Sequence, residues 1–322
     1  MNELAELLRQ GKFREALTKL EELPNTGSYP SSELFLVTRA ELLERTGRVQ
    51  EALKTIRSIH ELKENQVALR ARCSIIEGRI ARRKGHLIEA VDAFQRARHL
   101  AAKVGDQEYY CWANLRLMKT TSELSGPEAV ALTRAELGRL ISQLGSVDLT
   151  VAYHVFCAEI AARRGLLSES RKLTDLARSL IARTPNVWLR SLLSLQCSCL
   201  LYLEGAFGAS LLYAANALQT ADISGDADCR VASLTDLAAC YLALGQVSRS
   251  SRCIAAALSR SQADHHSQVL LVETLAEAKL TEGDLNACQE LLLSAQQMAT
   301  AQRQLAARRR AGDAFTKEQW ST

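Results

Sequence analysis

Glycines recur along this chain at nearly constant intervals, and this recurrence restricts the folds open to it. The intervals are 36, 38, 41, 39, 40, 40 and 38 residues, counted along Gly11, Gly47, Gly85, Gly126, Gly165, Gly205, Gly245 and Gly283. Each glycine follows a stretch with the apolar spacing of a helix. A chain of 322 residues is longer than one compact core usually fills. The fixed period therefore predicts a stack of repeats rather than two globular domains.

Small residues stand at fixed distances from these glycines. Five residues after the glycine, most copies have one: Ala16, Ala52, Ala90, Ser170, Ser210, Ser250 and Cys288. Others stand seven before it, as Ala238 does for Gly245, and twelve after it. Small residues let two helices cross closely while larger apolar residues fill the grooves. Glycine tolerates the left-handed conformation that ends a helix. The pattern predicts antiparallel helix pairs that turn at or within two residues of the glycines.

Three copies carry a more specific pattern. They read "GKFREAL" (11–17), "GRVQEAL" (47–53) and "GHLIEAV" (85–91). This pattern resembles the Gly-x-[aromatic]-x-Glu-Ala core of the tetratricopeptide repeat family, and the resemblance extends over residues 1–304. The period is longer than the usual value of about 34 residues, as in the longer-period relatives found in bacterial regulators. The copy around Gly126 matches worst, and we expect a shift of register or a kink there.

The resemblance implies an all-α fold, a right-handed superhelical solenoid of antiparallel helix pairs. We expect seven to eight pairs in a repeat domain over residues 1–304. Residues 305–322 then form a C-terminal cap or linker, or the start of a further domain. Composition agrees, because aromatic residues make up only 5% of the chain and prolines number only 4, while Leu, Ala, Arg and Glu favour helices.

Motifs for catalysis and metal binding are absent from the sequence. It contains no Gly-x4-Gly-Lys-Ser/Thr, no Gly-x-Gly-x-x-Gly and no His-Glu-x-x-His. The nine cysteines are scattered without zinc-finger spacing, so we expect most of them to pack in the core. His154 and Cys157 lack a third group that would orient a nucleophile. The sequence predicts a protein that is not an enzyme and that has no cofactor and no metal.

Charge and hydropathy narrow the choice of partner. The chain carries 40 basic and 36 acidic residues, a net charge of +4, which does not indicate nucleic-acid binding. No apolar run is long enough for a membrane span, and the N-terminus lacks a secretory core. We therefore predict a cytoplasmic protein with no membrane and no direct nucleic-acid contact.

A basic segment interrupts this balance. Residues 66–105 hold nine Arg or Lys against three Asp or Glu. In the tetratricopeptide family the first helix of each repeat lines the concave face. The resemblance therefore implies that a concave partner-binding site contains Arg72, Arg79, Arg82 and Arg83, with Arg116 and Arg163 at its edge. These arginines lack matching carboxylates on their own helix, so an anionic ligand could offset their repulsion. The alternative is a solvated outer helix face.

Further along, the same inner positions become apolar and include Leu195 and Tyr202. A groove with a basic front and an apolar middle suits an amphipathic helix or an extended peptide with an acidic segment. The alternative is that tight winding buries these residues against one another.

Two functions remain open. The first is a non-enzymatic protein- or peptide-binding module that acts as a scaffold or adaptor, the default use of such repeats. The second is the sensory N-terminal arm of a bacterial signalling or transcription-regulatory protein, with an output domain beyond Thr322. The oligomeric state is not indicated.

Overall fold

The computed structural model describes residues 2–22, 32–59, 66–258 and 265–298, and within these ranges the chain forms helices and turns. In chain order the α-helices are α1 (Asn2–Arg9), α2 (Phe13–Glu22), α3 (Ser32–Arg45), α4 (Val49–Ser58), α5 (Val67–Arg83), α6 (Leu87–Lys103), α7 (Gln107–Ser125), α8 (Ala131–Leu144), α9 (Val147–Arg163), α10 (Leu167–Leu180), α11 (Val187–Leu203), α12 (Phe207–Ser224), α13 (Ala227–Ala243), α14 (Val247–Leu258) and α15 (His265–Thr281). Residues 285–298 are helical as well.

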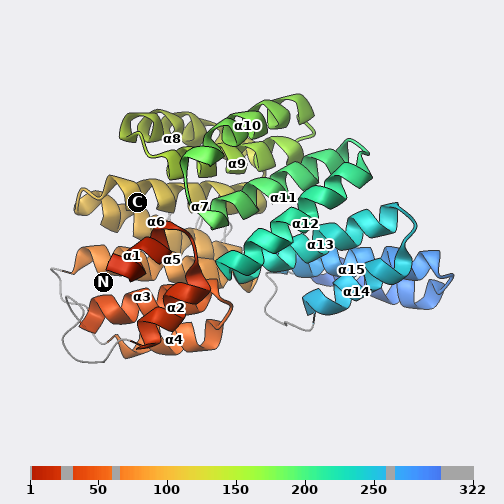
Figure 1. The fold of residues 1–322 in the computed structure, drawn as a ribbon, viewed down its shortest axis with the longest axis horizontal. Helices are drawn as coiled ribbons and strands as arrows, with labels where there is room; N and C mark the ends of the chain where they lie inside the picture. Colours follow the sequence, from red (N-terminus) through yellow and green to blue (C-terminus); the bar gives the residue numbers. More distant parts are fainter. Residues whose placement is uncertain (1, 23–31, 60–65, 259–264, 299–322) are drawn as a thin grey trace, which may run out of the picture.

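Successive helices form antiparallel pairs that stack into a right-handed solenoid (Figure 1). Each repeat glycine lies in the turn inside a pair, with φ between 65° and 92°. The predicted fold class and the predicted turns are therefore confirmed. Residues 305–322, predicted as a cap or linker, lie outside the described ranges.

The small residues predicted at helix crossings are buried. The small residues that stand five places after a repeat glycine, from Ala16 to Ser250, are fully buried. The last of them, Cys288, is 7% exposed. Ala238, seven positions before Gly245, is also fully buried. Seven of the nine cysteines are buried free thiols, as predicted: Cys73, Cys111, Cys157, Cys197, Cys229, Cys240 and Cys288. Small side chains at the crossings thus allow the close contact that each pair needs.

The copy around Gly126 departs from the others in its turn. Gly126 has ψ 160°, and a 3-10 helix over Pro127–Val130 precedes α8. Proline disfavours the helical conformation of the residue before it, which accounts for the extended ψ. Arg116 and Glu123 keep the positions ten and three residues before the glycine, where other copies also face inward. The irregularity is thus an altered turn and leaves the register of α7 unchanged.

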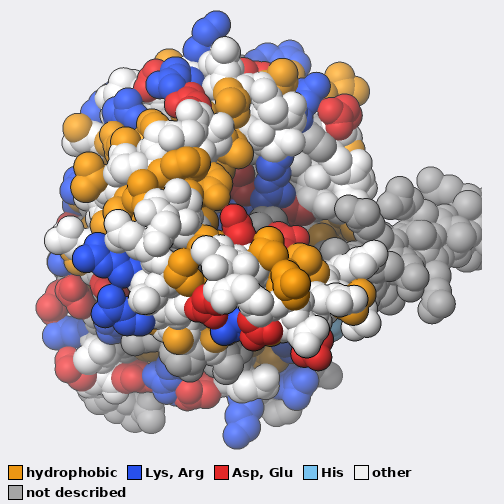
Figure 2. Space-filling model, turned by 90° about the vertical axis from the view of Figure 1, so that its right-hand side faces the viewer, with side chains coloured by type: hydrophobic (Ala, Val, Ile, Leu, Met, Phe, Trp, Pro, Cys, Tyr) orange, Lys and Arg blue, Asp and Glu red, His pale blue; other side chains and the backbone are white. Residues whose placement is uncertain are grey.

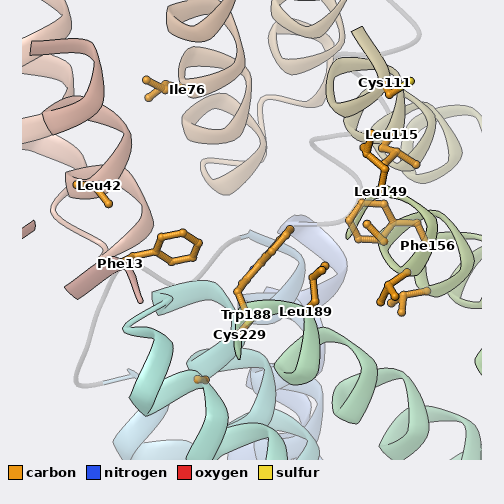
Figure 3. Packing of buried hydrophobic residues seen from close by; sticks show 14 of the residues in the cluster. Phe13, Leu42, Ile76, Cys111, Leu115, Leu149, Phe156, Trp188, Leu189 and Cys229 are labelled. Carbon is orange, nitrogen blue, oxygen red and sulfur yellow. The ribbon is translucent and has the colours of Figure 1, made fainter. Parts of the chain in front are cut away.

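The solenoid curls until its first repeats lie against α11 and α13 (Figure 1). The amide of Val187 donates a hydrogen bond of 2.8 Å to the carbonyl of Gln10. Phe13 of α2 and Trp188 of α11 point toward one another, with ring centroids 6.4 Å apart (Figure 3). One buried apolar cluster consequently runs from Leu4 to Cys229.

Two charged pairs, Arg45 with Asp226 and Arg83 with Asp228, complete this junction, and we call them the closure contacts. Arg45, at the end of α3, donates a hydrogen bond of 3.2 Å to Asp226, and its guanidinium lies 4.6 Å from the ring centre of Phe13 and 4.4 Å from that of Trp188. Arg83, at the end of α5, lies 2.9 Å from Asp228. Asp226 also caps α13, because its carboxylate accepts a hydrogen bond from the amide of Cys229.

None of the described helices combines the length and the apolar character needed to cross a bilayer.

The closure of the solenoid can be tested by comparing the stability of variants at two glycines of nearly identical conformation. Gly225 (φ 74°, ψ 11°) and Gly145 (φ 67°, ψ 11°) each end the second helix of a pair. A Cβ at Gly225 would lie 2.6 Å from the Cβ of Arg14, whereas nothing lies within 4 Å of one at Gly145. We expect Gly145→Ala to cost about 1–2 kcal/mol for the left-handed backbone. Gly225→Ala should cost at least about 1 kcal/mol more, for overpacking. Urea unfolding measures both, and equal costs would contradict closure.

Ala238 tests the crossing between α13 and α14. It packs in a cluster with Ile254 and Ala257 of α14. We expect Ala238→Trp to lower the free energy of unfolding by about 1–3 kcal/mol, because a large ring cannot fit there without moving both helices. Ala255→Trp, on the exposed face of α14, is the control and should change it by about 0.5 kcal/mol or less. Thermal melts followed by circular dichroism distinguish the two.

Candidate functional site

Closure turns the concave surface of the solenoid into a cavity. It has a volume of about 590 Å³ and is lined by α5, α7, α9, α11 and α13, together with Arg45 from α3. Figure 2 shows that one face of the molecule is hollowed, with basic and acidic side chains lying in the hollow. The cavity therefore exists because residues about 180 positions apart in the sequence meet, as Arg45 and Asp226 do.

Much of the wall is apolar. Helices α9, α11 and α13 supply these side chains: Val155, Phe156, Ala162, Trp188, Leu192, Leu195, Cys199, Leu203, Cys229 and Ala232. They lie on the first helices of successive repeats, where the repeat frame turns the same positions inward. Such a wall can hold an apolar ligand body by removing it from water.

The closure side of the cavity is rich in paired charges. Arg79 lies 2.5 Å from Glu44, and Arg83 lies 3.0 Å from the same carboxylate, which is fully buried. Arg82 reaches Asp228 at 3.9 Å and Glu123 at 3.8 Å. Burial alone would raise the pKa of Asp228, but Arg83 and Arg82 lower it to about 2. These groups hold the structure together as charged pairs.

The far side contains a second set of pairs. Lys119 and Arg163 each lie 2.7 Å from Glu159, and Arg163 lies 3.5 Å from Glu123. Burial opposes the charge of Arg163, but Glu159 and Glu123 outweigh it and raise the pKa of this residue. Most of the described ions of the cavity are thus paired, within one helix, between adjacent repeats or across the closure.

Two charged residues in the cavity lack such neighbours within the described residues. The guanidinium of Arg116 lies beside two rings, with the centre of Phe156 at 5.5 Å and that of Trp188 at 5.4 Å, and no described carboxylate lies within ion-pairing distance of it. Asp236 of α13 has no basic side chain within ion-pairing distance. Burial raises the pKa of Asp236 to about 7, although a hydrogen bond with Ser198 acts in the opposite direction.

The structure brings five of the residues predicted for the site to the cavity wall: Arg79, Arg82, Arg116, Arg163 and Leu195. The other three lie elsewhere. Arg72 donates a hydrogen bond of 2.9 Å to Glu41 of α3. Arg83 is buried in the closure contacts, and Tyr202 packs against Phe207 with ring centroids 5.2 Å apart.

The charge balance of the predicted arginines differs from the sequence-based expectation. Arg79 and Arg83 are buried rather than part of a solvated outer face. Their carboxylate partners come from other helices, Glu44 from α3 and Asp228 from α13. The expected repulsion among the four arginines of α5 is therefore relieved by the protein itself. Arg116, expected at the edge, is the lining arginine without a carboxylate partner among the described residues.

Sequence reasoning missed several lining residues: Arg45, Lys119, Trp188, Asp226, Asp228 and Asp236. Arg45 stands two residues before its repeat glycine, the same position as Arg83 and Arg163, so the repeat frame could have identified it. Asp226 and Asp228 carried no such signal, because only closure brings the start of α13 toward α3 and α5.

Comparisons with known proteins identify the fold. No family model and no curated protein sequence matches the chain. Among solved structures, a Rap protein complexed with Competence and Sporulation Factor matches with a TM-score of 0.65 and 13% identity, over 98% of this chain and 92% of that one. The Cut9–Hcn1 hetero-tetramer of the APC/C matches with a TM-score of 0.62 and 12% identity. That match covers 91% of this chain but only 54% of the other, so the chain spans about half the length of that relative. The chain therefore has a tetratricopeptide-repeat-like fold.

Proposed function

We propose that this protein is a non-enzymatic binding module that holds a short peptide, or the extended end of a protein chain, inside its cavity. The observation that carries this proposal is the closure of the solenoid around a cavity of about 590 Å³. Ligand pockets in proteins commonly measure about 300–1,000 Å³. The apolar wall and the two unpaired charges give such a ligand both a hydrophobic and a polar anchor.

The shape of the site argues for an extended segment over a folded partner. An open solenoid offers a long groove to a globular protein. Here the Arg45–Asp226 and Arg83–Asp228 pairs join the two ends of the groove. A partner must therefore enter the cavity as a narrow, extended segment of chain and not as a folded domain. The sequence-based proposal of a partner with an acidic segment agrees with Arg116, whose guanidinium is free to bind an anionic group of a ligand.

The Rap structure supports the proposal through its fold. The Rap structure contains Competence and Sporulation Factor, so a solenoid of this shape can accommodate a bound factor. At 13% identity the likeness concerns the fold. The case for binding in this chain rests on its own cavity.

The geometry also supports a regulatory use of the same site, which corresponds to the sensory-arm alternative. Arg45, Asp226 and Asp228 belong both to the closure contacts and to the cavity wall, and Arg82 of the wall lies 3.9 Å from Asp228. A ligand that touches them contacts the first repeats and α13 together. Its binding would favour the closed arrangement by its differential affinity for that arrangement.

Filling the cavity tests the proposal. Ala232 of α13 lines the cavity, so a phenylalanine there would occupy ligand space. We expect wild-type protein to retain members of a synthetic random hexapeptide library, measured by mass spectrometry after gel filtration. Ala232→Phe should weaken the binding of those peptides by about tenfold or more.

Ala209→Phe, on the exposed side of α12, is the matched control and should bind as wild type does. Circular dichroism melts verify that both variants are folded. Equal binding by wild type and Ala232→Phe, or the absence of any retained peptide, would contradict a peptide site in the cavity.

A further inference from the structure

We propose that the cavity selects a peptide of opposite charges, with a carboxylate held by Arg116, a cationic group held by Asp236 and an apolar body against the wall. This inference rests on the proposed function and specifies the chemistry of its ligand. The juxtaposition that carries it is one unpaired cation and one unpaired acid in a cavity whose other described ions are paired.

Arg116 is held in position but not neutralised. The rings of Phe156 and Trp188 lie beside its guanidinium, and no described carboxylate lies within ion-pairing distance. Burial, followed by the charges of Arg45, Arg79 and Arg82, lowers its pKa well below the usual value, and the charge of Asp226 opposes this shift without outweighing it. Arginine nevertheless stays charged in proteins. The lowered pKa therefore means that the charge is costly here, and a bound carboxylate would relieve it through two parallel hydrogen bonds.

Asp236 provides the opposite charge, and we call Arg116 and Asp236 the two poles of the cavity. Among the described residues, Ser198, Cys199 and Tyr202 of α11 and Cys240 of its own helix interact with it, and none of these is a cation. Its raised pKa means that the protein does not stabilise the ionised carboxylate. An ammonium or guanidinium group of a ligand would do so.

The two poles are separate from each other. Arg116 and Asp236 form no ion pair with each other, because no basic side chain lies within ion-pairing distance of Asp236 among the described residues. A single small anion would satisfy only one pole. A peptide can satisfy both, since its two termini, or an acidic and a basic side chain, carry the required charges along one chain.

Neither residue has a described ion-pair partner that would offset the cost of burying its charge. A fold without a ligand would be more stable if both positions were neutral, because each buries part of an uncompensated charge. Paired neighbours provide an internal comparison. Arg45 contacts the same Trp188 ring but is paired with Asp226, and Asp228 lies on α13 as Asp236 does but is paired with Arg83.

The first experiment needs no ligand. We expect Arg116→Met and Asp236→Asn to raise the melting temperature of the unliganded protein by a few degrees. Arg45→Met and Asp228→Asn should lower it, because each leaves a buried partner unpaired. The folded-state pKa of Asp236 is about 7 against 3.8 for a free side chain, so wild type loses stability between those values as pH rises. The advantage of Asp236→Asn should therefore grow from pH 5 to pH 8.

The second experiment compares four forms of the hexapeptide library on the full chain: free ends, acetylated N-terminus, amidated C-terminus and both blocked. Wild type should enrich peptides that carry both a carboxylate and a cationic group. Arg116→Met should lose the preference for the carboxylate, and Asp236→Asn the preference for the cation, with affinities reduced about thirtyfold or more. Loss of binding in the amidated library would identify the C-terminal carboxylate, whereas retained binding would identify an acidic side chain.

The outcomes separate this inference from the proposed function. If wild type retains peptides with no charge preference, or if both variants bind as wild type does, the two poles are wrong and the peptide site stands. If Arg116→Met and Asp236→Asn destabilise the unliganded protein as much as the paired controls do, the two residues are structural and the inference fails. If no library form binds wild type, the proposed function fails together with the inference.

Discussion

The contact between Arg45 and the start of α13 determines much of this structure. A guanidinium packed on Phe13 and Trp188 and bonded to Asp226 joins the first repeats to the sixth and seventh. Without this junction the concave surface would be an open groove, exposed to solvent along its length. With it, the same helix faces enclose a cavity whose chemistry depends on which charges remain unpaired.

The fold could be predicted from the local sequence pattern, because every repeat must meet the same physical requirements at its helix crossing and its turn. Ala16, Ser210 and Ala238 are small since two helices cross there, and Gly85 is glycine since its φ is 80°. These constraints act within some 40 residues and are visible in one sequence. The inward position of Arg116 and Leu195 follows from the same frame, ten residues before the glycine of each copy.

The charge state of the site could not be predicted in the same way. The curvature that brings Asp228 to Arg83 accumulates over several repeats, through small rotations that no single copy specifies. Judged by the sequence alone, the arginines of α5 have no matching carboxylates on their own helix and are predicted as a binding site. In the structure, Glu44 and Asp228 of other helices neutralise two of them. Arg116 and Asp236 differ from the other described ions of the cavity only in three dimensions, where those ions have ion-pair partners and these two have none.

The junction also gives the chain an order of events during synthesis. In an ordinary solenoid each repeat contacts its neighbours, so it can finish folding soon after the next repeat is made. Phe13 and Arg45 instead face partners at Trp188 and Asp226, which are made some 175–180 residues later. A nascent chain translated at about 5–20 residues per second would leave the first repeats without these partners for roughly ten seconds or longer. Their aromatic and charged surface is then exposed to chaperones and to other nascent chains until α13 has emerged.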